Sequence, residues 1–183
     1  MKRQIRSGLW ETNSSSTHTV YLTSETTQED ISELDKYIQD DGYLHIKFGE
    51  FGWEIKNYTD AYTKLQYALT MVIETECRYR PIQTEGESII FEETEGFKAI
   101  NSLIARVLDC AGVIVDSNME VSIYESQWNK GITMIGITHD GYIDHQSTDD
   151  FNSLQNFLDF YSMTLEEFIF DPNEVLHTDN DNH

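Results

Sequence analysis

The residues of this chain with the clearest potential for chemistry form a polar run near its start, from Asn13 to His18. A histidine beside hydroxyl side chains can act as the base for a serine nucleophile, or it can help those hydroxyls to hold a phosphate. Ser16 and His18 share a face if both belong to one strand. The candidate catalytic pair is therefore Ser16 and His18, and the sequence identifies no acid that would orient the histidine.

The same run, Asn13 to His18, also has a structural interpretation as a series of Asx and Ser/Thr turns that bond to their own backbone. The chain contains no G-x-S-x-G elbow, no Walker loop and no H-E-x-x-H pair, which are the motifs that would indicate a specific hydrolase chemistry. An enzymatic function is therefore the alternative prediction: a metal-independent nuclease or another phosphate-directed hydrolase.

A second polar cluster surrounds Asp140-Gly141, which is a strong signal for a two-residue hairpin. In that hairpin His139 and Asp144 share one face, and His145 points to the other face. Their side chains cannot converge on one ion. The sequence therefore predicts no metal site and no cofactor.

The charge of the chain indicates how it acts. The formal net charge is −21, and from Gly112 onward fourteen acidic residues face one basic residue, Lys130. Such a field repels nucleic acid and anionic membranes, and it attracts basic protein grooves, including those that hold nucleic acid. The alternative is that the charge serves solubility alone. The residues predicted to bind a partner are Asp149, Asp150, Asp159, Glu166, Glu167 and Trp128.

Basic residues gather in two places, at the start of the chain and on both sides of Tyr79. A basic patch with an aromatic side chain can touch a phosphate backbone and stack on a base. The residues of this secondary nucleic-acid contact are Lys2, Arg3, Arg6, Arg78 and Arg80.

The elements that must position these residues alternate between strands and helices. Residues 18–23 predict a strand. A capping signal at Thr26 or Thr27 predicts a helix to about Gln39, and Thr59 or Asp60 predicts the start of another. Residues 43–55 predict a β-hairpin around Gly49 to Gly52.

The second half of the chain also alternates between predicted helices and strands. Thr94 caps a predicted helix that ends before Gly112, and two further helices begin near Asp149 or Asp150 and at Thr164. Strands are predicted at 113–115, 121–124, 132–138 and 142–146. The fold class is therefore α+β: a single domain over residues 1–175 with a mostly antiparallel sheet and four to five helices. Residues 176–183 predict a polar, frayed tail.

The location of the protein follows from what its sequence lacks. Its apolar stretches are a few residues long, so none can span a bilayer, and its start has no apolar region typical of a secretory signal. Cys77 and Cys110 are too few for a disulfide scaffold, and Cys110 is expected to be buried within an apolar helix. The prediction is a cytoplasmic protein.

The segment from Arg6 to His18 resembles an amino-terminal signature, R-x-G-x-[WF]-E-T-N-S-S-S-T-H, shared by small phage and prophage proteins of Gram-positive bacteria. The length and acidity of the chain are similar to those of type II-A anti-CRISPR proteins, which bind Cas9 and block cleavage. The resemblance implies Cas9 or its complex with guide RNA as the partner, in the cytoplasm of a bacterial host. It carries no residue roles, because anti-CRISPR proteins share no catalytic motif.

The function predicted from resemblance and charge is thus an acidic, phage-type inhibitor that binds a basic nucleic-acid-handling protein. Either DNA binding or a conformational step needed for cleavage would be blocked. A host-takeover protein with another basic target is a third possibility, after the hydrolase described above.

Overall fold

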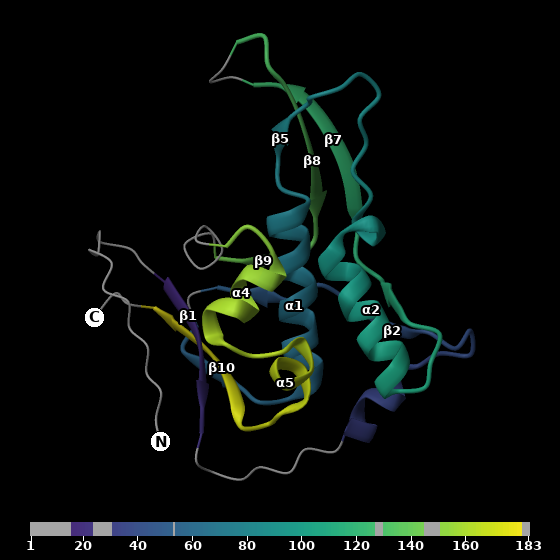
Figure 1. The fold of residues 1–183 in the computed structure, drawn as a ribbon, viewed down its shortest axis with the longest axis vertical. Helices are drawn as coiled ribbons and strands as arrows, with labels where there is room; N and C mark the ends of the chain where they lie inside the picture. The colour runs from purple at the N-terminus through teal and green to yellow at the C-terminus, as the bar shows by residue number, and fades with distance from the viewer. Residues whose placement is uncertain (1–15, 24–30, 53, 127–129, 145–150, 181–183) are drawn as a thin grey trace.

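A computed structural model describes residues 16–23, 31–52, 54–126, 130–144 and 151–180. The chain forms a body of helices and short sheets, and a slender sheet extends beyond the helix ends (Figure 1). We call this extension the arm; it consists of β5 (Arg80–Pro81), β7 (Met119–Glu125) and β8 (Thr133–His139).

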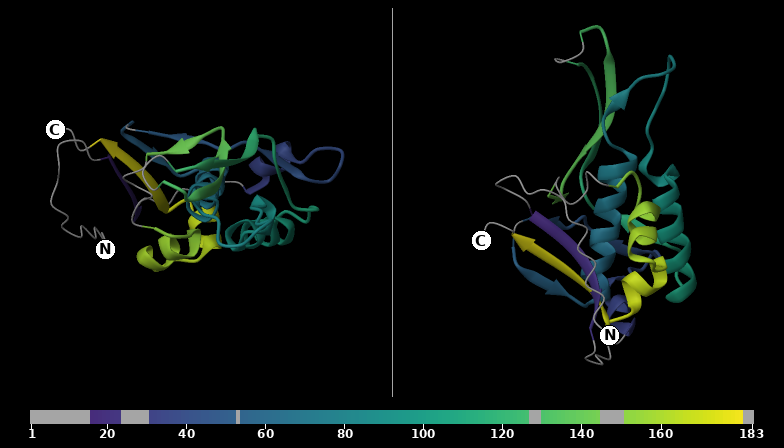
Figure 2. Two further views of the ribbon diagram at one scale, coloured as in Figure 1. Left: turned by 90° about the horizontal axis from the view of Figure 1, so that it is seen from above. Right: turned by 60° about the vertical axis from the view of Figure 1, so that its left-hand side comes forward.

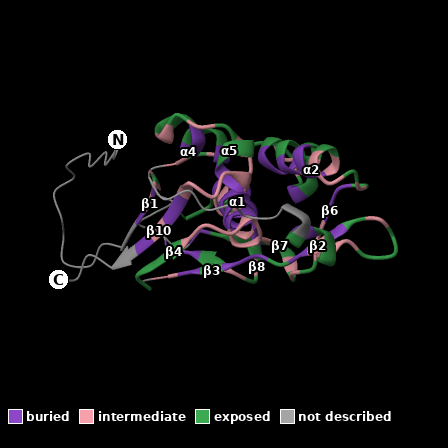
Figure 3. Ribbon diagram, turned by 90° about the horizontal axis from the view of Figure 1, so that it is seen from below, coloured by how far each residue is buried: buried purple, intermediate pink, exposed green. Residues whose placement is uncertain are grey.

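Helix α1 (Ala61–Glu76) runs through the middle of the body. Its predicted cap is confirmed, because an Asp60 side-chain oxygen accepts a hydrogen bond from the Thr63 N–H at 2.7 Å. Side chains on every side of α1 are buried, as expected for a helix that other elements surround. Figure 3 shows this buried helix between the sheets and the outer helices.

The remaining helices cover α1, directly or through a neighbour. They are η1 (Ile31–Tyr37), η2 (Phe91–Glu93), α2 (Glu95–Val107), α4 (Leu154–Tyr161) and α5 (Leu165–Phe170). The predicted caps at Thr94 and Thr164 are confirmed. The cap of α4 is Ser153, whose hydroxyl accepts from the Asn156 N–H at 3.2 Å; the residues expected to cap it, Asp149 and Asp150, lie outside the described residues.

The first and last described strands lie side by side in an antiparallel sheet. Its order is β1 (Ser16–Leu22), β10 (Glu174–Asn180) and β4 (Lys56–Tyr58). The prediction of a frayed tail from residue 176 is therefore wrong for residues 176–180. The polar composition conceals an alternation in which Leu176 and Thr178 are buried, and β10 is bonded along both edges.

Two short strand pairs are parallel: β2 (Leu44–Ile46) with β6 (Val113–Val115), and β3 (Glu50–Phe51) with β9 (Tyr142–Ile143). The hairpins predicted at 43–55 and at Asp140-Gly141 are therefore wrong.

Gly141 serves a close approach rather than a hairpin. Its φ is +83°, and a Cβ there would lie 2.6 Å from the Cβ of Phe48, so only glycine fits. Beyond it, the Tyr142 N–H donates to the Gly49 carbonyl at 2.9 Å. The chain thus leaves β8 for β3 instead of turning back along β8.

The arm is antiparallel, with β8 between β5 and β7. The right-hand view of Figure 2 shows β7 and β8 rising from the body, with the segment that follows β5 beside them. The predicted strand at 121–124 is confirmed within β7, and the one at 132–138 is confirmed over residues 133–138 of β8.

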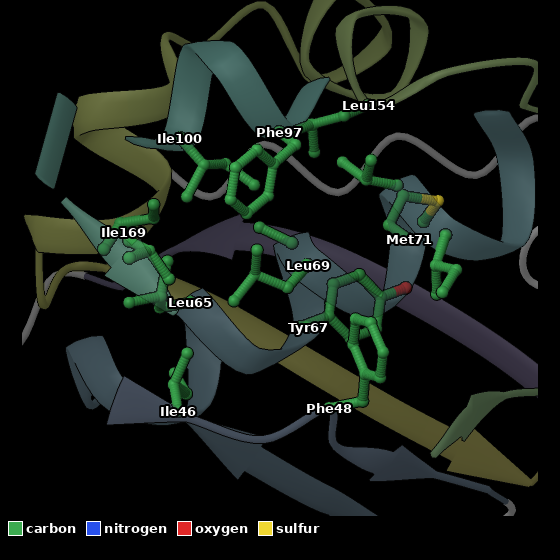
Figure 4. Packing of buried hydrophobic residues seen from close by; sticks show 14 of the residues in the cluster. Ile46, Phe48, Leu65, Tyr67, Leu69, Met71, Phe97, Ile100, Leu154 and Ile169 are labelled. Carbon is green, nitrogen blue, oxygen red and sulfur yellow. The ribbon is translucent and has the colours of Figure 1, made fainter. Parts of the chain in front are cut away.

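The core gathers where α1 meets the outer helices and β2. Figure 4 shows the packed side chains from α1, α2, α4, α5 and the segment of β2, which include Ile46, Phe48, Leu65, Tyr67, Leu69, Met71, Phe97, Ile100, Leu154 and Ile169. The α+β class is confirmed, with two antiparallel three-stranded sheets and two parallel pairs among the described residues. No helix in the described part of the chain has the length and apolar character needed to cross a membrane.

Candidate protein-binding surface

His18, the predicted catalytic base, lies inside the body with 6% of its surface exposed. Its Nε2 is 3.1 Å from the carbonyl oxygen of Gly52, and its Nδ1 is 3.4 Å from the hydroxyl of Tyr67. A carbonyl can only accept, so Nε2 carries the proton and Nδ1 accepts from Tyr67. Burial lowers the pKa of His18 and raises that of Tyr67 well above its usual value, which favours this neutral pair.

The backbone of His18 is also held, because the Tyr161 hydroxyl donates to the His18 carbonyl at 3.2 Å. The histidine thus ties β1 to α1 and α4. The one lone pair that a base would use is occupied by Tyr67. Of the other residues in the predicted loop, Asn13 and the side chain of Ser16 lie outside what the structure describes.

The acidic residues predicted to contact a partner differ in the bonds that they already form within the chain. Asp159 is exposed on α4 and accepts from the Gln155 amide at 2.8 Å. Glu166 forms an ion pair with Arg106 at 2.6 Å. Glu167 completes the capping box of α5, and its pKa is lowered by hydrogen bonds from Thr164. Two of the three described acids therefore have structural work inside the chain; Asp149, Asp150 and Trp128 fall outside the described residues.

The structure describes only two of the five residues of the predicted basic patch, Arg78 and Arg80. Arg80 forms an ion pair with Glu87, and the Nε of Arg78 lies 3.4 Å from the Glu74 carbonyl. Tyr79 is partly buried, and its ring packs edge-on against Tyr124 with centroids 5.2 Å apart. The remaining basic residues of the prediction, Lys2, Arg3 and Arg6, belong to a segment that the structure does not describe.

Most of the described basic side chains are neutralised locally. Lys36, Lys56, Arg80, Lys98 and Arg106 each pair with a neighbouring carboxylate, and Lys64 is fully buried. Many exposed carboxylates have no Lys or Arg at ion-pair distance among the described residues. They include Asp35, Asp40, Glu50, Glu92, Glu93, Glu120, Glu125, Asp140 and Asp159. The net negative charge therefore lies on the surface of both the body and the arm.

A charged cluster that the sequence did not indicate joins β2 to β6. The Nδ1 of His45 is 2.9 Å from Asp116, and its Nε2 is 3.0 Å from Asp41. Carboxylates only accept, so both ring nitrogens donate when the imidazole is protonated, and these bonds raise the pKa of His45. No group of three or more His, Cys, Asp or Glu suited to a metal occurs among the described residues.

The two cysteine thiols, those of Cys77 and Cys110, are both free and lie at the ends of different helices. Cys77 is buried at the end of α1, and burial raises its pKa to about 12, which leaves it a poor nucleophile. Cys110 is half-buried and lies beyond the end of α2, so the prediction that it is buried within the helix is wrong.

The arm exposes apolar side chains on β7. Ile123 is 59% exposed, Val121 47% and Tyr124 45%. Beside the far end of β8 lies an open hollow of about 560 Å³, lined by Pro81, Ile82 and Ile132 among others. Val121 and Ile123 lie on one face of β7, whereas Tyr124 lies on the other. The alternation of apolar residues in β7 predicts that this strand has one apolar face. Only the strand order shows that β7 lies at an edge of its sheet.

Comparisons with protein-family models, with curated proteins and with solved structures found no match to this chain. Similarity therefore assigns no function. The surface itself, acidic overall and apolar along β7, is the basis for a functional proposal.

Proposed function

We propose that this protein is an acidic inhibitor of the phage type that binds a basic nucleic-acid-handling protein in the cytoplasm of a bacterial host. Cas9 loaded with guide RNA is the first candidate partner, on the resemblance of residues 6–18. The observation that carries the proposal is the charge: the net charge is −21, and most described Lys and Arg side chains are already paired or buried.

Two parts of the surface have different roles in this function. The dispersed carboxylates attract a basic groove over a distance of about 10 Å at 0.1 M salt and act mainly on the rate of encounter. The exposed apolar residues of the arm, Val121 and Ile123, then supply contacts that exclude water and slow dissociation. Occupying a groove that holds nucleic acid would block DNA binding or a later step.

The geometry around His18 favours binding over hydrolysis. A general base needs a lone pair within reach of the proton that it removes. The lone pair on Nδ1 of His18 already accepts a hydrogen bond from the Tyr67 hydroxyl inside the body. No other described residue of the predicted loop supplies a base.

The proposal is tested by surface plasmon resonance with Cas9–guide RNA and by a cleavage assay. One variant carries Glu92→Gln, Glu93→Gln, Glu120→Gln, Glu125→Gln and Asp159→Asn, and the matched control carries Lys36→Gln and Lys98→Gln. We expect the first variant to associate about tenfold more slowly and the control to associate faster, since it is more negative. Binding of the unmodified protein should weaken as salt rises.

Unchanged cleavage at a large molar excess of the inhibitor in low salt would reject Cas9 as the partner. One inhibitor molecule that disabled many Cas9 complexes would instead show an enzyme.

A further inference from the structure

Strand β7 is one of the two outer strands of the arm, because the strand order is β5-β8-β7. Two hydrogen bonds fix which of its backbone groups face β8: the Asp140 N–H donates to the Asn118 carbonyl at 3.1 Å, and the Ser126 N–H donates to the Ile132 carbonyl at 2.8 Å. Bonded residues alternate along an antiparallel ladder. The even-numbered residues of β7 therefore bond to β8.

The odd-numbered residues of β7 direct their N–H and C=O groups outward, away from β8. They are Met119, Val121, Ile123 and Glu125. Among the described residues, no strand pairs with this side of β7. An edge with unpaired backbone groups is a template for another extended chain.

The side chains along this edge continue an apolar row that begins in the middle of the sheet. Val121 lies opposite Ile137, and Ile123 lies opposite Ile135. The two β8 residues are buried, at 7% and 0% exposure, whereas their β7 partners are 47% and 59% exposed. A strand added beside β7 would cover Val121 and Ile123 through cross-strand contacts.

Charge decides what kind of strand fits. Glu120 and Glu125 are exposed near the two ends of β7. A second copy of the chain would bring another net charge of −21 to the same edge, and nucleic acid would be repelled. Lysine or arginine opposite the glutamates is attracted instead, since opposite charges stabilise cross-strand pairs.

We propose that the outer edge of β7 receives an extended basic segment of the partner protein as a fourth strand of the arm. Apolar side chains of that segment cover Val121 and Ile123, and its Lys or Arg side chains, which alternate with the apolar ones, lie on the opposite face near Glu120. The proposal rests on the proposed function only for the positive charge of the partner.

The test uses a fluorescent peptide of about twelve residues in which lysine alternates with valine or threonine. A second peptide has the same sequence with alternate backbone nitrogens methylated, which removes donors but keeps the charge. Fluorescence anisotropy measures binding of each peptide to the full chain. We expect the first to bind and methylation to weaken binding at least about tenfold. Equal binding of both peptides, or binding of neither, would overturn the proposal.

Variants locate the peptide on the edge. Ile123→Pro removes an outward N–H and leaves the bonds to β8 in place, because proline is tolerated where the N–H of an edge strand faces solvent. Ile123→Lys places a repelling charge there. The matched control is Ile55→Lys, since Ile55 is 58% exposed and lies in the body. We expect both Ile123 variants to weaken binding at least about tenfold and the control less than about twofold.

Equal losses in Ile123→Lys and Ile55→Lys would mean that charge alone holds the peptide, and the edge proposal would be wrong. Where Ile123→Pro lowers the melting temperature, Ile123→Lys carries the test. Sedimentation velocity gives a further outcome: a dimer that Ile123→Lys abolishes would show that β7 pairs with a second copy.

The edge and the proposed function can fail separately. Peptide binding without binding to Cas9–guide RNA would reject that partner and keep the edge. Binding to Cas9–guide RNA that Ile123→Pro leaves unchanged would reject the edge and keep the function.

Discussion

The body and the arm treat polar and apolar groups in opposite ways. In the body, Tyr67 and Lys64 are fully buried on α1, and their polar atoms find partners there. In the arm, Val121 and Ile123 remain exposed beside outward-facing backbone groups. These two polar groups of the body are therefore satisfied within the chain, whereas these two apolar side chains of the arm remain open to solvent.

Two buried polar groups of α1, on Lys64 and Tyr67, join segments that are distant in sequence. The Nζ of Lys64 donates to the carbonyls of Asp171 and Glu174, at 2.8 and 3.2 Å, which places a cation at the end of α5. The Tyr67 ring packs against Phe51 with centroids 4.9 Å apart, and its hydroxyl meets His18. These contacts fix α5, β3 and β1 around α1.

The largest expected effect is that of Tyr67→Ala. Loss of a buried ring should lower the free energy of unfolding by about 3–5 kcal/mol. Tyr67→Phe keeps the ring and loses only the bond to His18, so we expect about 1 kcal/mol. Urea denaturation followed by circular dichroism measures both. A similar loss in the two variants would show that the hydroxyl, rather than packing, dominates.

Lys64→Met is expected to have a smaller effect than Tyr67→Ala. Methionine keeps much of the apolar stem, but the carbonyls of Asp171 and Glu174 lose this donor, which should cost about 1–3 kcal/mol. Lys98→Met is the control, because Lys98 is in an exposed pair with Glu95 that is worth at most about 1 kcal/mol. If the two variants unfolded at the same urea concentration, Lys64 would not be holding α5.

The pH dependence of stability separates two histidines of the body. His45 has a raised pKa in the folded state, so its contribution is full below the unfolded value of 6.5 and is lost as pH rises through the folded pKa. His18 has a lowered pKa, so its contribution is present above 6.5 and is lost as pH falls.

Melting temperatures of the unmodified protein, His45→Gln and His18→Gln between about pH 5.5 and about pH 8.5 test these signs. We expect the deficit of His45→Gln to be widest at the acid end and that of His18→Gln to be widest at the alkaline end. Deficits independent of pH would contradict both pKa directions.

The smallest effect is expected at the exposed edge of the arm. Ile123→Ala should change the free energy of unfolding by less than about 0.5 kcal/mol. Ile135→Ala, at the position directly opposite, should cost about 2–5 kcal/mol, because Ile135 is fully buried. Denaturation of the two variants compares one residue type on both sides of one strand pair. Equal losses would mean that β7 is covered.

Local signals in the sequence were sufficient where the structure depends on neighbouring residues. The caps at Asp60, Thr94 and Thr164 act over three residues and were predicted correctly. Strand partners depend on distant segments, so both predicted hairpins were wrong. Gly141 illustrates the reason. A glycine is needed there because Phe48 lies so close to it, and not because the chain turns back along β8.

Of the candidate site, the sequence predicted only the excess of acidic residues and not which of them bond within the folded chain. The sequence shows how many acids there are, but the roles of Glu166 and Glu167 depend on Arg106 and Thr164 in the folded chain. The burial of His18 depends on Gly52 and Tyr67, which no local pattern connects to it. The exposed edge of β7 likewise follows from the strand order alone.

Strand β10 also affects how the protein forms during synthesis. It lies between β1 and β4, both of which the ribosome makes much earlier. Until residues 174–180 emerge, the nascent chain holds two strands that lack their shared partner, and such unpaired strands are prone to misassociation. The sheet can close only after translation has passed these residues, so β1 and β4 are both made well before their shared partner.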